Sequence, residues 1–233
     1  MLSAALSLVA AGAAVHGAFH RNSPVFGPAI WRLPPAADGR PRVSLTFDDG
    51  PNPVATPRIL DALAAAEARA TFFVLGRHAE RWPELVARAA REGHQIGNHG
   101  YHHRKLHDRG PRFVRRDLTM GRAAIEDAGG GTPAFFRAPH GFRSPWVSSI
   151  AASLGERIVG WTLGVWDTAL PGADEIARRT VSGARPRSIV LLHDGDGYDA
   201  LGDRTQTAAA LPTILRALRE KGYGVDVLPT HPR

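Results

Sequence analysis

Residues 43–51 read Val-Ser-Leu-Thr-Phe-Asp-Asp-Gly-Pro, an apolar run that ends in a polar turn. Residues 43–47 are typical of a short buried β-strand, and the Gly-Pro pair that closes the stretch is a turn signal. The carboxylates of Asp48 and Asp49 therefore come at the carboxyl end of a predicted strand.

Strand-like and helix-like segments alternate from this point to the end of the chain. Predicted strands lie at residues 43–47, 70–75, 94–98, 134–137, 158–163, 188–193 and 225–228. Predicted helices lie at residues 56–69, 83–92, 112–128, 144–154, 174–181 and 205–221. Strands that alternate with helices indicate an α/β fold with a parallel sheet covered by helices. About seven such units favour a distorted or incomplete (β/α) barrel with about seven parallel strands and an active site at their C-terminal ends.

The composition limits the chemistry that is available. The length of 233 residues suits one domain with a short appendage. The 43% hydrophobic and 22% charged residues are typical of a globular protein rather than a disordered one. Cysteine is absent, which excludes disulfides, thiolate zinc sites and a cysteine nucleophile. Any metal site must therefore use histidine, aspartate or glutamate.

The chain is basic, with a formal net charge of +7. Such a charge suits an anionic lipid surface, an anionic cell wall or a nucleic acid. The basic clusters are short and lack interleaved aromatic residues, which argues against nucleic-acid binding. We therefore expect association with an anionic membrane or cell wall and no nucleic-acid partner.

Residues 1–20 form an apolar, alanine-rich stretch without lysine, arginine, aspartate or glutamate. A helix of about 19 residues spans roughly 28 Å, close to the ~30 Å hydrocarbon core of a bilayer, and the small residues 11–13 suit a signal-peptidase site. This predicts a signal peptide or membrane anchor, and thus an exported or membrane-anchored protein that faces the cell envelope. No basic residue precedes the stretch, so a soluble helix that packs on the domain is the alternative. The proline-rich residues 21–41 are expected to connect it to a catalytic domain at 42–233.

Five of the predicted strands have polar or aromatic residues at or after their ends: Asp48 and Asp49; Asn98, His99, His102 and His103; Arg137 and His140; Trp166 and Asp167; His193 and Asp194. The carboxyl ends of parallel strands meet at one edge of a barrel, where active sites lie. A carboxylate with two histidines is a three-ligand set with open coordination positions, as a hydrolytic metal requires. The strand ends therefore predict a metal-dependent active site.

Each of these signals also has a structural interpretation. Asp-Asp-Gly-Pro is a turn signal, and His193 follows an apolar run that suits the core. His99 and His103 are four residues apart, a spacing that also places two side chains on one face of a helix. Their joint occurrence at strand ends favours the functional interpretation.

Five segments resemble, in order, the five motifs of the polysaccharide deacetylases, also called carbohydrate esterase family 4 or the NodB-homology domain. They are Thr-Phe-Asp-Asp-Gly-Pro at 46–51, His-Gly-Tyr-His-His at 99–103, Arg-Ala-Pro-His-Gly at 137–141, a degraded fourth motif at 161–167, and Leu-Leu-His-Asp at 191–194. The resemblance extends from about residue 42 to residue 228, and the first, second and fifth motifs together are highly specific.

The resemblance implies a metal site and two proton-transferring residues. Asp49, His99 and His103 would bind one divalent metal ion, usually Zn²⁺, with Co²⁺, Ni²⁺ or Mn²⁺ as alternatives. Asp48 would be the general base and His193 the general acid. Successive residues of a strand point to opposite faces, which fits the division of Asp48 and Asp49 into a base and a ligand.

The resemblance also implies supporting residues. Arg137 would hold Asp48 in place, and Asp167 would support the charged network around Arg137 and His193. The residues implied to face the substrate are Tyr101, His140, Trp166 and Leu191.

Three departures from the family pattern bear on the substrate. Gly100 replaces the usual Ser or Thr, and His140 stands where Tyr or Phe is common. Gly164 and Thr168 stand where an Asp and a Trp are usual. The metal ligands and the acid–base pair are complete, so we expect an active enzyme with an altered sugar-facing wall.

The implied function is metal-dependent hydrolysis of N-acetyl groups from aminosugars in a polysaccharide such as peptidoglycan or a chitin-like chain. One alternative is an N-deacetylase or deformylase of a lipid-linked sugar, which anchoring by residues 1–20 would favour. A second alternative is a catalytically silent carbohydrate-binding module. A mononuclear iron oxygenase also uses two histidines and a carboxylate, but it has no need of Asp48 or His193.

Overall fold

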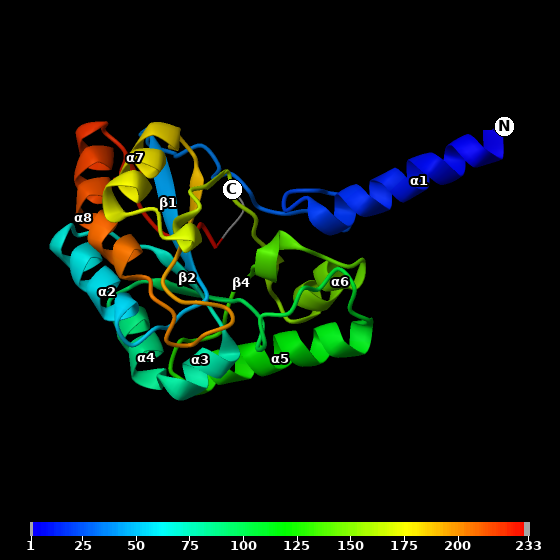
Figure 1. Ribbon diagram of the computed structural model, residues 1–233, viewed down its shortest axis with the longest axis horizontal. Helices are drawn as coiled ribbons and strands as arrows, with labels where there is room; N and C mark the ends of the chain where they lie inside the picture. The colour runs from blue at the N-terminus through cyan, green and yellow to red at the C-terminus, as the bar shows by residue number, and fades with distance from the viewer. Residues whose placement is uncertain (1, 231–233) are drawn as a thin grey trace.

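A curled parallel β-sheet forms the centre of the computed structural model, which describes residues 2–230 (Figure 1). Within these residues the strands are β1 (Arg42–Asp48), β2 (Thr71–Val74), β3 (Gln95–Asn98), β4 (Phe135–Phe136), β5 (Arg157–Ile158), β6 (Leu163–Gly164), β7 (Ile189–His193) and β8 (Gly224–Val225). Their order across the sheet is β5-β4-β3-β2-β1-β7-β6, with β8 beside β1, and each of these pairings is parallel. Within residues 2–230 the edge strands β5 and β6 do not pair, so the sheet is an incomplete (β/α) barrel, as predicted.

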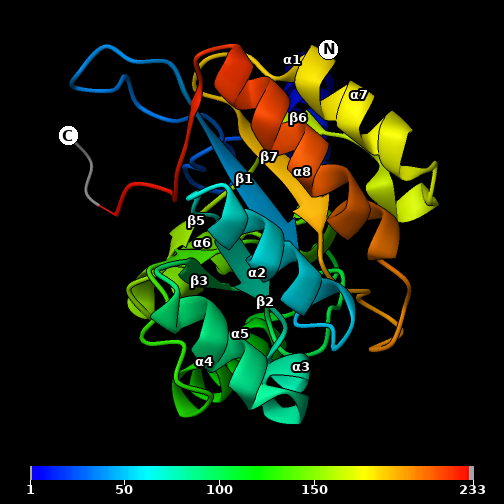
Figure 2. The same ribbon diagram turned by 90° about the vertical axis from the view of Figure 1, so that its left-hand side faces the viewer.

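Helices cover the outer face of this curled sheet. The described helices are α1 (Leu2–Phe19), α2 (Ala55–Ala65), α3 (Gly76–Arg81), α4 (Pro83–Arg91), α5 (Pro111–Asp127), α6 (Trp146–Ser153), α7 (Ala173–Gly183) and α8 (Thr205–Glu220). Neighbouring helices contact one another in the order α7, α8, α2, α4, α5 and α6, which follows the order of the strands. Figure 2 shows α2, α8 and α7 side by side in front of the sheet.

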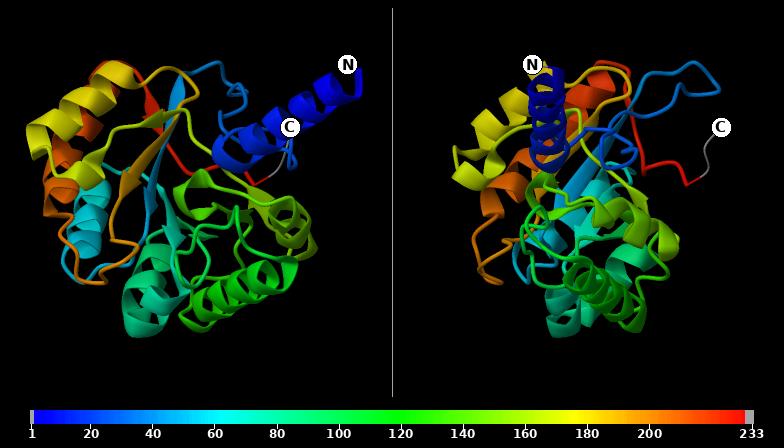
Figure 3. Two further views of the ribbon diagram at one scale, coloured as in Figure 1. Left: turned by 45° about the vertical axis from the view of Figure 1, so that its right-hand side comes forward. Right: turned by 90° about the vertical axis from the view of Figure 1, so that its right-hand side faces the viewer.

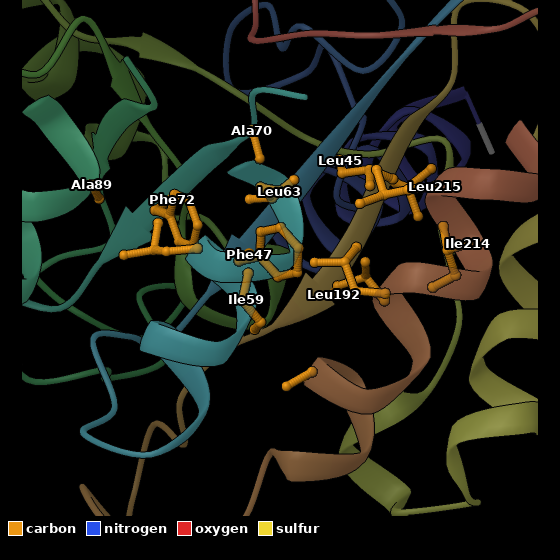
Figure 4. Packing of buried hydrophobic residues seen from close by; sticks show 14 of the residues in the cluster. Leu45, Phe47, Ile59, Leu63, Ala70, Phe72, Ala89, Leu192, Ile214 and Leu215 are labelled. Carbon is orange, nitrogen blue, oxygen red and sulfur yellow. The ribbon is translucent and has the colours of Figure 1, made fainter. Parts of the chain in front are cut away.

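Apolar side chains fill both sides of the sheet. On the outer side, Phe47 of β1 and Leu192 of β7 pack with Ile59 of α2 and Leu215 of α8 (Figure 4). A separate cluster on the other face contains Leu33, Phe73, Phe135, Val159, Ile189 and Leu228. Strands with apolar contacts on both faces read as continuous apolar runs, which accounts for the Ile-Val-Leu-Leu sequence of β7.

The central strand β1 directs its residues alternately to these two sides. Leu45 and Phe47 belong to the outer cluster, whereas Thr46 and Asp48 bond to a guanidinium group on the inner side. The parallel register places Asp48 opposite His193 of β7. The fold therefore brings together two residues that are far apart in the sequence.

The single strand predicted at 158–163 is wrong, because this segment forms the two strands β5 and β6. The chain changes partners between them: β5 pairs with β4, and β6 pairs with β7. Between the strands, Gly160 N donates to the Ile30 carbonyl and Thr162 N donates to the Ile189 carbonyl. Residues of the predicted connecting segment thus occupy the place where the sheet would otherwise close.

His99 and His103 do not share a helix, although their spacing also allowed one. Residues 99–110 form no helix in the structure. Gly100 and His103 have φ angles of 78° and 55°, and this left-handed backbone is incompatible with an α-helix. The helix α3 was not predicted either.

Helix α1 extends away from the rest of the chain (Figures 1 and 3). Residues 7–16 are exposed, and its last turn contacts the domain through Phe19, whose ring lies 5.2 Å from that of Phe142 and 4.8 Å from that of His107. Among residues 2–230, no helix has the length and apolar character needed to cross a membrane. The predicted division of the chain at residues 20 and 41 stays a prediction.

Candidate active site

A cavity of about 660 Å³ opens at the carboxyl ends of the central strands. The predicted site residues that line it are Asp48, Asp49, His99, His103, His140, Trp166, Asp167, Leu191 and His193. A cavity of this size, at this edge of a parallel α/β barrel, is the expected position for an active site.

Asp49, His99 and His103 form a buried cluster in which one potential ligand atom from each residue lies within 4.8 Å of the others. Asp49 Oδ1 is 3.3 Å from His99 Nε2 and 3.1 Å from His103 Nε2. This buried oxygen accepts no hydrogen bond from the described residues. The three atoms therefore converge as the ligands of a metal ion do, and a divalent cation fits the donor set.

The backbone conformation of Asp49 and a contact of the His99 ring hold these two residues in the cluster. Asp49 has a φ of 73°, a left-handed conformation typical of strained functional positions. His99 Nδ1 lies 2.8 Å from the Arg137 carbonyl oxygen. A hydrogen bond from Nδ1 to this carbonyl leaves the Nε2 lone pair directed at the cluster. Burial alone would raise the pKa of Asp49, but the imidazoles of His103 and His99 outweigh it and keep that pKa well below its usual value. Asp49 is thus ionised.

Asp48 lies beside the cluster and is held by Arg137. Arg137 Nη1 donates to Asp48 Oδ1 at 2.7 Å and to Thr46 Oγ1 at 2.8 Å, while Nη2 donates to the Gly160 carbonyl oxygen at 2.9 Å. The guanidinium is fully buried and lies 4.1 Å from the centre of the Phe73 ring. Asp48 Oδ2 is 3.8 Å from His99 Nε2, so this second oxygen faces the cluster.

His193 lines the same cavity and is held by Asp167. Asp167 Oδ1 lies 2.9 Å from His193 Nδ1, and Asp167 Oδ2 accepts from the His193 backbone N–H at 2.7 Å. Burial alone would lower the pKa of His193, but the attraction of Asp167, followed by those of Asp49 and Asp48, raises it to about 9. His193 therefore carries a proton at neutral pH.

The expected support of Arg137 by Asp167 is not found among residues 2–230. Arg137 bonds to Thr46, Asp48 and Gly160, whereas Asp167 bonds to His193 and accepts from Thr207 Oγ1 at 3.0 Å. Arg137 therefore holds Asp48 of β1, whereas Asp167 holds His193 of β7.

The predicted substrate-facing residues do not all reach the cavity. His140 and Leu191 line it, and Trp166, with 76% of its surface exposed, also does so. His140 Nε2 lies 2.9 Å from the Tyr198 hydroxyl. Burial, together with the nearby His103, lowers the pKa of His140 to about 4, so this ring is neutral at neutral pH. Tyr101 is absent from the lining, because its hydroxyl donates to Glu80 Oε2 at 2.7 Å.

The structure explains why residue 100 is a glycine rather than the usual Ser or Thr. A Cβ at Gly100 would lie 2.5 Å from Asp117 Oδ2. The Asp117 carboxylate accepts hydrogen bonds from the backbone N–H groups of Tyr101 and His102, both at 3.2 Å. Asp117 therefore orders the loop between His99 and His103 with its own hydrogen bonds.

Sequence reasoning missed part of the cavity wall. Tyr198 follows the fifth motif within a Gly- and Asp-rich loop, and an aromatic residue at that position was a usable signal. Phe19, His20 and Arg21 also line the cavity, although they precede the predicted catalytic domain. No motif marks these three residues, because only the fold brings them to the site.

Comparison with known proteins supports one family. The polysaccharide deacetylase model matches residues 36–159. A chitooligosaccharide deacetylase of Sinorhizobium fredii is 39% identical over 203 residues, which cover 84% of this chain and 94% of the relative. A peptidoglycan-N-acetylglucosamine deacetylase of Bacillus cereus is 36% identical over 202 residues, which cover 84% of this chain and 89% of the relative.

Solved structures show the same similarity. A peptidoglycan N-acetylglucosamine deacetylase matches with a TM-score of 0.79 and 32% identity, over 87% of this chain and 91% of that one. A family 4 carbohydrate esterase from Streptomyces lividans, in complex with acetate, matches with a TM-score of 0.74 and 32% identity, over 82% and 94% of the two chains. A family 4 pseudoenzyme from Bacillus anthracis matches with a TM-score of 0.77 and 27% identity, over 85% of this chain and 66% of that one. Because a pseudoenzyme shares this fold, activity depends on the site residues rather than on the fold.

Proposed function

Since the chain belongs to the polysaccharide deacetylase family, we propose that it hydrolyses N-acetyl groups of chitooligosaccharides or peptidoglycan to acetate and free amine. One observation carries the proposal: Asp48, Asp49, His99, His103 and His193 line one cavity. The buried Asp–His–His cluster supplies a metal site, and Asp48 and His193 line the same cavity.

Asp49, His99 and His103 would hold the metal ion. A divalent ion bound there activates a water molecule and polarises the acetyl carbonyl group. Two imidazole nitrogens and one carboxylate form a donor set that suits Zn²⁺ and leaves coordination positions open. We propose Zn²⁺ as the native ion, with Co²⁺, Ni²⁺ or Mn²⁺ as ions that the same donors accept.

Asp48 would act as the general base. Its Oδ1 is occupied by Arg137, whereas its Oδ2 faces the metal cluster and is placed to take a proton from the attacking water. The water oxygen then forms a bond to the acetyl carbon. Arg137 fixes the orientation of the carboxylate, so that no reorganisation is needed when the proton moves.

His193 would act as the general acid. Asp167 binds its Nδ1, which leaves Nε2 as the nitrogen that gives a proton to the sugar nitrogen. That proton allows the C–N bond to break, so that acetate and a free amine leave the site. The pKa of about 9 for His193 means that this proton is present at neutral pH.

The sugar-facing wall would consist of His140, Trp166 and Leu191, together with Tyr198. An exposed indole beside a cavity is suited to stacking on a sugar ring. His140 stands where Tyr or Phe is common in the family, and its Nε2 contacts the Tyr198 hydroxyl on this wall. We therefore expect the substrate preference to differ from that of relatives with the usual residue.

The place of action that we propose is the cell envelope. Similar proteins include peptidoglycan deacetylases, and the net charge of +7 suits an anionic wall or leaflet. Residues 1–20 would direct or attach the chain to that site, and residues 42–233 would form the catalytic domain. Deacetylation or deformylation of a lipid-linked sugar at the membrane is the second candidate function, which the exposed, uncharged helix α1 favours.

The test is acetate release by the metal-loaded protein. N-acetylglucosamine oligomers, peptidoglycan and a lipid-linked N-acetylated sugar are compared, and acetate and free amine are measured in the same samples. We expect equal amounts of the two products from at least one of these substrates. Binding of the glycans without acetate from any of them, and without formate from an N-formylated lipid-linked sugar, would instead identify a silent carbohydrate-binding module.

A further inference from the structure

Asn22 precedes the proposed catalytic domain, yet its side chain binds the backbone beside the active site. Asn22 Nδ2 donates to the Trp161 carbonyl oxygen at 3.0 Å, and Asn22 Oδ1 accepts from the Trp161 N–H at 3.3 Å. Arg21 Nε donates to the same carbonyl oxygen at 3.3 Å. The backbone at Trp161 is thus held at both of its polar groups.

The peptide unit between Gly160 and Trp161 connects this contact to Arg137. In a trans peptide the N–H and the C=O point in opposite directions. The bond from the Trp161 N–H to Asn22 therefore directs the Gly160 carbonyl to the other side, where it accepts from Arg137 Nη2 at 2.9 Å. The contact is close, because a Cβ at Gly160 would lie 2.1 Å from Asn22 Oδ1.

Arg137 depends on this carbonyl oxygen because its guanidinium group is fully buried. Its Nη1 donates to Thr46 and Asp48, its Nη2 donates to Gly160, and its Nε has no hydrogen-bond partner among the described residues. A buried N–H group that loses its acceptor is costly. If the Gly160 carbonyl moves, the guanidinium must turn to follow it, and its bond to Asp48 changes as well.

We infer that Asn22 is a positioning residue for the deacetylation proposed above. It fixes the Gly160 carbonyl, this carbonyl fixes Arg137, and Arg137 orients the carboxylate of Asp48. The segment before the predicted domain is therefore a working part of the active site.

The first test compares Asn22→Ala with Ser148→Ala. Ser148 Oγ donates to the Phe26 carbonyl, so it ties down the same N-terminal segment without bonding to Gly160 or Trp161. For Asn22→Ala we expect kcat to fall about 10-fold, less than the 10²-fold that a 1 Å misplacement can cost, with KM and metal content unchanged. For Ser148→Ala we expect a normal kcat, even if the melting temperature falls.

The second test asks whether Asn22 acts through Arg137. If it does, the double variant Asn22→Ala/Arg137→Ala has the kcat of Arg137→Ala alone, because there is no oriented guanidinium left to lose. Two independent contributions would instead multiply. A purely structural role for Asn22 predicts a lower melting temperature without a change in kcat.

Gly160→Ala reaches the same contact from the other side. Gly160 does not have a positive φ, so its backbone does not require glycine. A Cβ there would lie 2.1 Å from Asn22 Oδ1 and 3.2 Å from the Arg21 carbonyl oxygen, so the clash with Asn22 is the larger of the two. We expect Gly160→Ala to lower kcat as Asn22→Ala does, and to add little in the Asn22→Ala background. This variant keeps the inference testable if Asn22→Ala folds poorly.

Either of two results overturns the inference: a wild-type kcat in folded Asn22→Ala and Gly160→Ala, or a multiplied loss in the double variant with Arg137→Ala. A wild-type protein that releases no acetate would overturn the proposed function itself. The two failures are therefore distinguishable in one set of assays.

Discussion

Asp167 binds His193 twice, with one carboxylate oxygen 2.9 Å from the ring Nδ1 and the other accepting from the backbone N–H at 2.7 Å. The two bonds fix both the position and the rotation of the imidazole. Thr207 Oγ1 also donates to the carboxylate at 3.0 Å, so the carboxylate itself is held. His193 thereby keeps a fixed orientation toward the cavity and, because its pKa is raised to about 9, a proton.

Asp167→Asn should move the alkaline limb of the pH–activity profile to lower pH. The carboxylate of Asp167 is the main attraction that raises the pKa of His193 against the effect of burial. Without that charge the pKa falls, and the acid loses its proton earlier as pH rises, by about 1–3 pH units. A bound cation offsets the attraction of Asp49 and Asp48, so both proteins are compared with metal bound. An unshifted alkaline limb would remove His193 from the acid role.

Gly197→Ala should weaken metal binding, although Gly197 is not a ligand. A Cβ at this position would lie 2.0 Å from His103 Nδ1, so the imidazole must move. We expect the metal affinity to fall about 10–100-fold, as it does when the groups that orient a ligand are changed. Titration with Zn²⁺ or Co²⁺, followed by calorimetry, gives the Kd.

Gly110→Ala is the matched control for this measurement. A Cβ there meets no atom within 4 Å, and Gly110 has no positive φ. Its metal affinity should equal that of the wild type. An equally tight Kd in Gly197→Ala would show that the loop around Gly197 does not constrain His103.

Glu156→Gln should stabilise the protein more at pH 8 than at pH 5. Glu156 is 1% exposed, and burial, only partly offset by hydrogen bonds from Asn98, raises its pKa from 4.5 to about 8. The folded state therefore keeps a proton that the unfolded state releases between these two values, so stability falls as pH rises through this window. Glutamine retains the acceptor for Asn98 and carries no charge.

The expected gain for Glu156→Gln at pH 7 is a few kcal/mol, since each pH unit of this window contributes about 1.4 kcal/mol. Urea unfolding at several pH values measures it. The exposed Glu84→Gln serves as a control and should stay within about 0.5 kcal/mol of the wild type. If the free energies of unfolding of Glu156→Gln and the wild type differ by the same amount from pH 5 to pH 8, the raised pKa of Glu156 is contradicted.

Much of the fold follows from local patterns. The strands predicted at 43–47, 70–75, 94–98 and 188–193 correspond to β1, β2, β3 and β7, because strand patterns and turn signals are local. The break between β5 and β6 did not follow, because it depends on Ile30 and Ile189, which are far away in the sequence. Short edge strands carry too few residues for a pattern to show.

For the site, too, local patterns predicted some features, whereas others depend on residues that are distant in the sequence. The motif positions that line the cavity were named from the sequence, since their spacing follows the strand ends. The orientation of the Tyr101 side chain could not be predicted, because its hydroxyl donates to Glu80 on α3, a helix without a sequence signal. The role of Asn22 was equally hidden, because its partners Gly160 and Trp161 are reached only through the fold.

The central claim is tested most directly by the rate of acetate release from Asp48→Asn, with metal content measured on the same sample. The side-chain amide that Asp48→Asn introduces cannot take a proton from water, and Asp48 is outside the metal cluster. We expect one metal ion per chain and a kcat lower by about 10²–10⁴-fold, whereas Asp49→Ala should lose metal and activity together. Wild-type acetate release by metal-loaded Asp48→Asn would contradict the account.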